Sequence, residues 1–404
     1  MALLLHILLF KIRIFFKLST ELNAKNVFKH ISSLIVFGGF SLGAFLFART
    51  LTTYLLNEAH LGLFLLHRFL SMLLFVLFVS VNVGNIIVSY ATFYRSRETE
   101  YLLTKPVPHV NVFIVKFLDN FFYSSTVLFV IVVSVLLGYG SHFRMPWNFY
   151  LETIVVQFVP FMLIAGCIAV TALMVLMKLA HRIGVGYVVA ILSLLYFGSL
   201  FVFFKSTNPL QLVDSVMMHY PHVDQYFAFL DPPFVRFLPN HWIAESLYWT
   251  MRGNDTLAQR YALFMLSMAG VCFAGMVLVA RKLFYSSWIS SLSLRHSTEE
   301  QSSMLQFLSL SRPPRMEPQA SVILRKEFWQ FIREPSQWIH FGVIMLLVVT
   351  FIISIAKLQF NATLPAYLTV SYLVLLMFDA FLIASIALRF VYPMISIEGE
   401  SFWS

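Results

Sequence analysis

The chain has 404 residues, of which 59% are hydrophobic and only 12% are charged, and its formal net charge is +9. A soluble domain carries about 25% charged residues, because charge covers its surface. The composition therefore excludes a soluble enzyme, a nucleic-acid-binding module and a disordered chain. The long apolar blocks predict an all-α, polytopic membrane protein.

The N-terminal segment predicts an interfacial helix instead of a signal peptide. Its apolar run, Leu3–Phe10, precedes the charges of Lys11, Arg13 and Lys17. This order is the reverse of that in a signal peptide, and no small-residue cleavage site follows. We expect the segment to lie on the inner leaflet of the membrane.

Apolar blocks long enough to cross a bilayer follow along the chain. A membrane-spanning helix needs about 20 apolar residues. The blocks predict about eight transmembrane helices: Ile31–Leu51, Phe69–Ser89, Phe121–Leu137, Ile154–Met177, Gly184–Phe204, Tyr261–Ala280, Phe341–Ala356 and Tyr367–Ala387. With the N-terminus in the cytoplasm, most of the 28 Lys and Arg residues fall on the inner side. The expected location is the cell (inner) membrane.

The blocks group into two units joined by a linker. Residues 1–290 form a first transmembrane unit with six spans and an outer cap at about 205–259. Residues 291–320 are polar and contain Pro313 and Pro314, so they predict a cytoplasmic linker. Residues 321–404 predict an amphipathic elbow helix, Ser321–Glu334, and two spans of a second, incomplete unit.

A short cytoplasmic segment after the second span carries the main functional signal. Glu98 and Glu100 precede an apolar centre, Tyr101, Leu102 and Leu103, and then Lys105 and Pro106. A helix this short is not stable alone in water, so its apolar side chains need a partner surface. That surface is either a groove on a cytoplasmic motor subunit, whose Arg or Lys would pair with the acidic residues, or the lipid headgroups.

The second unit repeats part of this pattern. Glu398, Glu400, Phe402 and Trp403 again place an aromatic residue shortly after a Glu-x-Glu sequence. Internal repeats are common in transporters. These residues are predicted to form a second contact with the same motor subunit.

Polar residues inside the spans are candidates for a substrate path or a proton relay. Asp379 lies in the eighth span, and Asn82 and Asn85 share one face of the second. Each can instead serve helix pairing, which leaves both readings open. Lys116 and Asp119 are three residues apart and are expected to pair with each other.

Small residues and possible metal ligands give weaker indications of function than the segment around Glu98–Pro106. Gly39 and Gly43, and Gly270 with Ala274, have the spacing of close helix–helix contacts. His219, His222 and Asp224 have no further clustered ligand, so no metal site is predicted. The sequence also has no Gly-x-x-x-x-Gly-Lys-Ser/Thr loop to hold ATP phosphates.

Four segments, taken in order, resemble the permease subunits of bacterial ABC-2-type exporters. They are Glu98–Val107, which is similar to the family's E-L-x-x-L-L-x-x-P-[IV] element, the Pro-x-x-Trp element in Pro239–Ala244, the elbow Arg325–Pro335 and the segment Glu398–Trp403. The resemblance implies a membrane-spanning permease component of an ATP-driven exporter. It implies a separate cytoplasmic ABC ATPase, as a dimer, that binds ATP and Mg²⁺ and hydrolyses the nucleotide.

The same resemblance implies that this chain binds no cofactor and is not an enzyme. Three other interpretations stay open at this point. They are an ion-coupled secondary transporter that uses Asp379, a membrane-embedded enzyme, and a truncated remnant of a longer permease.

Overall fold

The structure is a computed structural model that describes residues 24–58, 62–207 and 234–310, with a few residues between 341 and 352. The chain divides into two compact units, Met1–Leu308 and Ser309–Ser404. Every element of regular structure in the described residues is a helix. The predicted all-α fold class is confirmed for this part of the chain.

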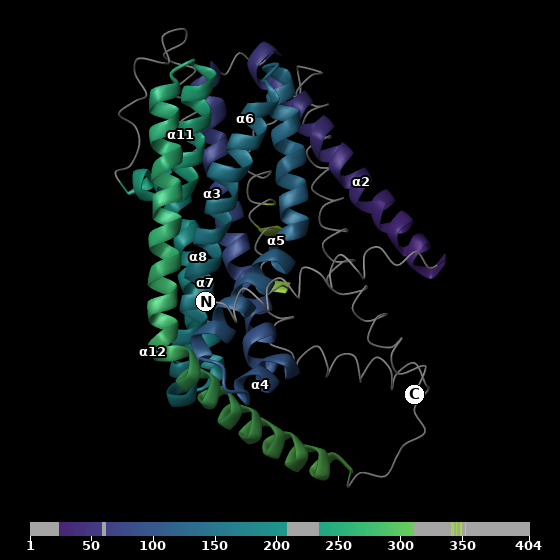
Figure 1. Ribbon diagram of the computed structural model, residues 1–404, viewed down its shortest axis with the longest axis vertical. Coiled ribbons are helices and arrows are strands. Elements are labelled where there is room, and N and C mark those ends of the chain that lie inside the picture. Colours follow the sequence, from purple (N-terminus) through teal and green to yellow (C-terminus); the bar gives the residue numbers. More distant parts are fainter. Residues whose placement is uncertain are drawn as a thin grey trace. The chain divides into compact units, whose positions relative to one another are not determined.

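Most of the long helices of the first unit run back and forth along one axis, and α2 is inclined to it (Figure 1). In chain order they are α2 (Ala24–Thr53), η1 (Tyr54–Glu58), α3 (Gly62–Tyr90), η2 (Ala91–Arg95), α4 (Arg97–Leu103), α5 (His109–His142), α6 (Trp147–Glu152), η3 (Thr153–Phe158), α7 (Val159–Ile183), α8 (Val185–Thr207), η5 (Val235–Phe237), α11 (Pro239–Met251) and α12 (Asp255–Leu310). Three of them, η1, η2 and η3, are short π-helical stretches.

The helix boundaries follow from local sequence. Pro106 and Pro108 separate α4 from α5, since proline lacks an amide donor and restricts the residue before it. Gly184 separates α7 from α8 with φ 90°, a backbone conformation that favours glycine. Gly253 takes φ 73° in the turn before α12 for the same reason.

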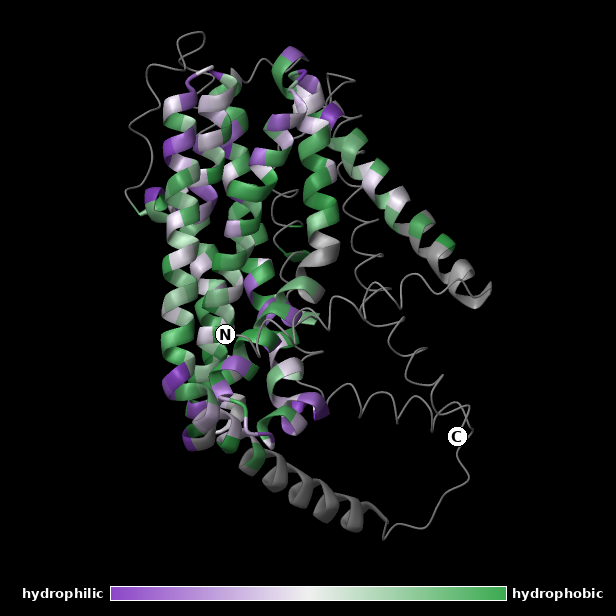
Figure 2. Cartoon of the chain, in the orientation of Figure 1, coloured by the Kyte–Doolittle hydropathy of each residue, from purple (hydrophilic) through white to green (hydrophobic). Residues whose placement is uncertain are grey.

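The core has two large apolar clusters, one toward each end of the bundle. One joins the first half of α3, the end of α5, α6, η3, the start of α7, α11 and α12 around residues such as Phe161 and Trp242. The other joins the end of α3, η2, the start of α5, the middle of α7 and α12 around Phe93, Phe113 and Phe284. Hydrophobic residues dominate the middle of the bundle, and polar residues gather toward its two ends (Figure 2).

Four of the described helices are long and apolar enough to cross a membrane. They are Gly62–Arg95, Trp147–Ala180, Ala190–Thr207 and Asp255–Leu292. They match the second, fourth, fifth and sixth predicted blocks. The first block lies within α2, and the third lies within α5, whose Phe129–His142 is a shorter apolar stretch. The eighth block, most of the seventh, and both predicted elbow helices lie outside the described residues.

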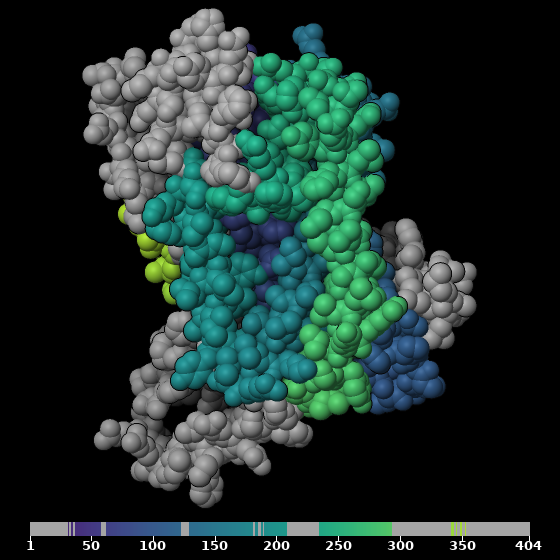
Figure 3. Space-filling view, turned by 90° about the vertical axis from the view of Figure 1, so that its left-hand side faces the viewer, coloured from purple at the N-terminus to yellow at the C-terminus, as the bar shows by residue number. Residues whose placement is uncertain are grey.

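Helix α12 is longer than the sequence predicts. It continues through Leu310, into the stretch 291–320 that was expected to be a linker. The physical reason is that the stretch before Leu310 contains no proline or glycine, the first prolines being Pro313 and Pro314. On one face of the molecule, α12 and α8 stand on either side of a strip where α3 is visible (Figure 3).

The close approach of two helices occurs at a glycine that sequence spacing does not indicate. A Cβ added to Gly138 on α5 would lie 2.3 Å from the carbonyl oxygen of Phe45 and 2.9 Å from the Cβ of Ala48, both on α2. A Cβ added to Gly39, Gly43 or Gly270 would meet nothing within 4 Å. The expected contacts at those three glycines are therefore absent among the described residues.

Candidate functional site

Helix α4 follows α3 after a π-helical stretch and one extended residue. Helix α3 continues into η2, and Ser96 then adopts an extended conformation (φ −77°, ψ 125°) before α4 begins at Arg97. The amides of Thr99 and Glu100 both donate to the carbonyl of Ser96. A single π-helical turn is rare and often lies at a functional site.

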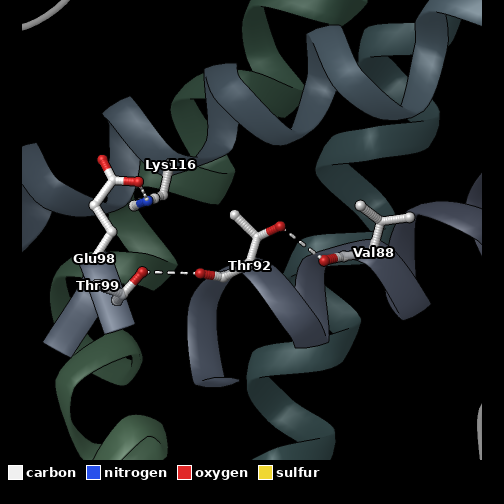
Figure 4. Close-up of polar contacts among 5 residues, drawn as sticks. All are labelled: Val88, Thr92, Glu98, Thr99 and Lys116. Carbon is white, nitrogen blue, oxygen red and sulfur yellow. Dashed lines mark hydrogen bonds and ion pairs between the residues drawn. The ribbon is translucent and has the colours of Figure 1, made fainter. Parts of the chain in front are cut away.

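One side of α4 is attached to the bundle. Thr99 is fully buried, and its Oγ1 donates a hydrogen bond of 2.8 Å to the carbonyl oxygen of Thr92 in η2 (Figure 4). Thr92 is among the last four residues of the continuous helix Gly62–Arg95, where backbone acceptors lack partners within the helix. Leu103 packs against the apolar cluster around Phe93 and Phe113.

An ion pair adds a second attachment. The Nζ of Lys116 on α5 lies 2.6 Å from Oε2 of Glu98. The lysine side chain is 3% exposed and the glutamate side chain 50% exposed. A buried ammonium needs a charged or polar partner, and Glu98 supplies it. Sequence spacing had suggested Asp119 as the partner of Lys116.

The opposite side of α4 faces outward. Tyr101 is 60% exposed, and the Nζ of Lys105 lies 4.6 Å from the centroid of its ring. Pro106 is exposed, whereas Leu102 is only half-buried. The predicted coupling residues thus separate into an attached set, Glu98 and Leu103, and an exposed set.

A line of buried polar side chains runs from Lys116 into the bundle. Asn120, one turn along α5, donates to the Oγ of Ser89 at 2.7 Å and to Oδ1 of Asn85 at 3.5 Å. The Nδ2 of Asn82 donates to the carbonyl of Ala165. The hydroxyl of Tyr196 on α8 donates to Oδ1 of Asn82.

These contacts place Asn82 and Asn85 between helices. Both residues are buried and bonded to neighbouring segments. Their role in a substrate path stays a prediction. One buried acceptor in this line, Oδ1 of Asn120, has no hydrogen-bond partner among the described residues.

A second polar cluster, which the sequence did not indicate, lies where α11 packs on the first turns of α3. A small pocket there is lined by Phe64, His67, Arg68, Ser71, His241, Ala244, Glu245 and Tyr248. The sequence signal that could have indicated this cluster is the pair of polar residues Asn240 and His241 directly after Pro239, both of which are buried in α11. The Nδ2 of Asn240 donates to both the carbonyl and the hydroxyl of Ser71 at 3.0 Å.

Burial shifts the titration of the two ionisable groups that α11 brings to this cluster. Burial, with Arg68 and Arg236 adding to it, lowers the pKa of His241 to about 4. Burial raises the pKa of Glu245, although a hydrogen bond from the indole of Trp249 and the two arginines oppose the shift. The cluster and α4 lie toward opposite ends of α3 (Figure 1).

Several predicted site residues lie outside the described part of the chain. They are Asp379, Glu398, Glu400, Phe402 and Trp403. Within the described ranges, no group of three or more His, Cys, Asp or Glu side chains is arranged to hold a metal ion.

Comparison with known proteins gives one match. The sequence profile of a family described as "Putative ATP-binding cassette" matches residues 25–404. No curated protein and no solved structure matches the chain.

This match corrects the functional interpretation drawn from the sequence. The chain was expected to be the permease component of an ABC-type exporter. The family description is that of an ATP-binding cassette, which is the nucleotide-binding component of such a system and not its permease. The interpretation from the sequence and the family match agree that the chain belongs to an ABC transporter context. The permease and exporter interpretations are not retained.

Proposed function

We propose that this chain, which belongs to the family described as "Putative ATP-binding cassette", is the membrane-embedded docking component of an ATP-binding cassette system. In this role it holds a nucleotide-hydrolysing subunit at the membrane surface through α4. The observation that carries the proposal is the attachment of α4, which fixes one face to the bundle and leaves Tyr101 60% exposed.

Membrane location is supported by the four long apolar helices. The proposal extends to the remaining predicted blocks, in α2, in α5 and at residues 341–356 and 367–387, as further spans. Helix α4 then lies on the cytoplasmic side. The distribution of Lys and Arg along the sequence supports this orientation, because cytoplasmic segments are rich in them.

The short length of α4 supports a contact role. A seven-residue helix is not stable by itself, so its geometry comes from Thr99, Leu103 and the Glu98–Lys116 pair. These attachments orient the helix before any partner arrives. An oriented surface loses less conformational entropy on binding than a flexible loop does.

We place ATP, Mg²⁺ and the hydrolytic step on the partner subunit. In ATP-binding cassettes, a glycine-rich loop whose backbone amides surround the phosphates precedes a lysine that contacts them. No glycine in this sequence is followed by lysine. The chain is therefore assigned a binding role and not a catalytic one.

The family description itself favours a second candidate, in which this chain binds the nucleotide directly. The two candidates differ in where a nucleotide attaches. Photolabelling of the purified complex with an azido analogue of ATP separates them. Label on the partner supports docking, whereas label on this chain, competed by ATP, overturns the docking proposal.

The docking contact is tested by purifying the full-length chain in mild detergent. We expect an ATP-hydrolysing subunit with a phosphate-binding loop to remain bound, and Tyr101→Asp to remove most of it without unfolding the chain. The matched control is Phe237→Asp, which makes the same change at another exposed aromatic residue, in η5 beside α11. Equal retention in the two variants would contradict the proposal.

A further inference from the structure

We propose that the docking surface of α4 is cationic and accepts an acidic partner surface with an apolar recess for the Tyr101 ring. The inference rests on the proposed docking function and names the chemistry of the partner's contact. It reverses the expectation from the sequence, in which Glu98 and Glu100 met Arg or Lys on the partner.

The acidic residues of α4 are already used within the chain. Glu98 holds Lys116 at 2.6 Å, and a partner cation that took Glu98 would leave a buried ammonium without its counterion. Glu100 is only half-exposed and is also engaged in an interaction within the chain. Neither carboxylate is therefore a favourable contact for a basic partner.

Apart from Glu98, which is paired with Lys116, the exposed charged residues between Arg95 and Lys105 are all positive. Arg97 lies one helical turn before Tyr101 and is exposed on the same side of α4. Lys105 is exposed after the end of the helix, and its Nζ returns to the Tyr101 ring. Arg95 is exposed in η2, with its guanidinium 5.4 Å from the centroid of the Tyr90 ring.

This arrangement gives an aromatic side chain with cations around it. A tyrosine with flanking Arg or Lys is the kind of anchor that dominates protein interfaces, where the ring fills a recess and the charges meet complementary ones at the rim. Opposite charges at the rim speed association and select the partner, and like charges there are repelled.

A protein partner fits this position better than lipid headgroups do. Lipids surround the sides of a helical bundle, whereas α4 lies at its end, after the apolar helix Gly62–Arg95 has finished (Figure 1). The apolar and buried contacts of α4 are made inward, by Thr99 and Leu103. The exposed face is thus available in the direction away from the bundle.

The test replaces Tyr101 with photoreactive benzoylphenylalanine in the full-length chain, in native membranes, and identifies the cross-linked peptide by mass spectrometry. We expect a peptide of the ATP-hydrolysing subunit in which Asp and Glu outnumber Lys and Arg. The yield should fall as salt is raised, since the Debye length shortens to about 3 Å at 1 M.

Charge reversal gives the second measurement. Arg97→Glu with Lys105→Glu should lower the cross-linking yield about tenfold or more, because like charges would face each other. Lys178→Glu with Arg182→Glu, an equal charge change at exposed residues near the end of α7, should leave the yield unchanged.

The possible failures are distinguishable. A cross-linked peptide of the same subunit that is rich in Lys and Arg would overturn the charge assignment and leave the docking function intact. An equal loss of yield in the Lys178 and Arg182 control would also overturn it. Cross-links to lipid alone would overturn the docking function together with this inference.

Discussion

Lys116 on α5 and Glu98 on α4 meet at 2.6 Å, with the lysine buried and the glutamate half-exposed. Loss of the partner therefore costs the two residues different amounts of free energy. Without Lys116, Glu98 is left at a hydrated surface. Without Glu98, Lys116 is left as a charge inside the bundle, close to the polar line that begins at Asn120. The pair fixes α4 mainly because the buried ammonium of Lys116 is unstable without the carboxylate of Glu98.

This asymmetry predicts different costs for the two single substitutions. Glu98→Gln should lower the free energy of unfolding by about 1–3 kcal/mol, because a buried ammonium loses its counterion. Lys116→Met should cost less than about 1 kcal/mol, since the buried charge disappears with its partner. Thermal unfolding in detergent measures both, with Glu152→Gln, at an exposed glutamate of α6, as the control. A larger loss for Lys116→Met would contradict the assignment.

The buried hydroxyl of Thr99 predicts a difference between two small replacements. Thr99→Val keeps the shape but leaves the carbonyl of Thr92 without its donor, which should cost about 1–3 kcal/mol. Thr99→Ser keeps the hydroxyl and should cost less. Limited proteolysis of residues 96–108, alongside thermal unfolding, should show faster cleavage in the valine variant. Identical cleavage rates would argue that α4 is held without this bond.

The contact between α2 and α5 predicts sensitivity at one glycine and tolerance at another. Gly138→Ala would place a methyl group 2.3 Å from the carbonyl oxygen of Phe45, so the helices must separate and the melting temperature should fall. Gly270→Ala meets no atom within 4 Å in α12 and should be neutral or stabilising by up to about 1 kcal/mol. If both variants melt alike, α2 does not pack on α5 at Gly138.

The buried histidine of α11 predicts a loss of stability in acid. His241 has a pKa of about 4 when folded, below the ordinary histidine value of 6.5, so between these two pH values the unfolded chain binds a proton that the folded chain does not. The free energy of unfolding should therefore fall as pH drops from 6.5 toward 4, by at most about 3 kcal/mol. The raised pKa of Glu245 acts in the opposite direction and reduces the loss.

His241→Phe isolates the contribution of the histidine. The phenyl ring can keep the packing against Tyr261, whose ring centroid lies 6.4 Å away, but it cannot take a proton. The melting temperature of this variant should fall less between pH 7 and pH 5 than that of the unmodified chain. Parallel curves for the two proteins would show that His241 is not the group responsible.

Much of the helical architecture could be predicted from the sequence. The apolar blocks that became α3, α7, α8 and α12 are long enough to mark helices by length and composition alone. The segment around Glu98–Leu103 is distinctive in the sequence because it combines charges with apolar residues on a piece too short to be stable alone. These signals are local in the chain, so a single sequence contains them.

The parts that were not predicted depend on contacts between distant segments. Helical periodicity shows which residues share a face, but it does not show which neighbour that face meets. Lys116 was therefore assigned to Asp119, three residues away, although its partner is Glu98 on another helix. The Gly39–Gly43 spacing suggested a helix contact that belongs instead to the isolated Gly138. The histidines of the α3–α11 cluster are 174 positions apart, far beyond any local pattern.

The π-helical stretch Ala91–Arg95 has a consequence for how this protein tolerates insertions and deletions. A π turn holds one residue more than an α turn, and each residue of an α-helix advances the chain by about 100°. Deleting a single residue there would restore regular α-helical winding and keep every helix. It would also rotate Tyr101 about the helix axis, so that its side chain points in a different direction. The direction in which the exposed side of α4 points therefore depends on the number of residues between Tyr90 and Ser96 as much as on their identity.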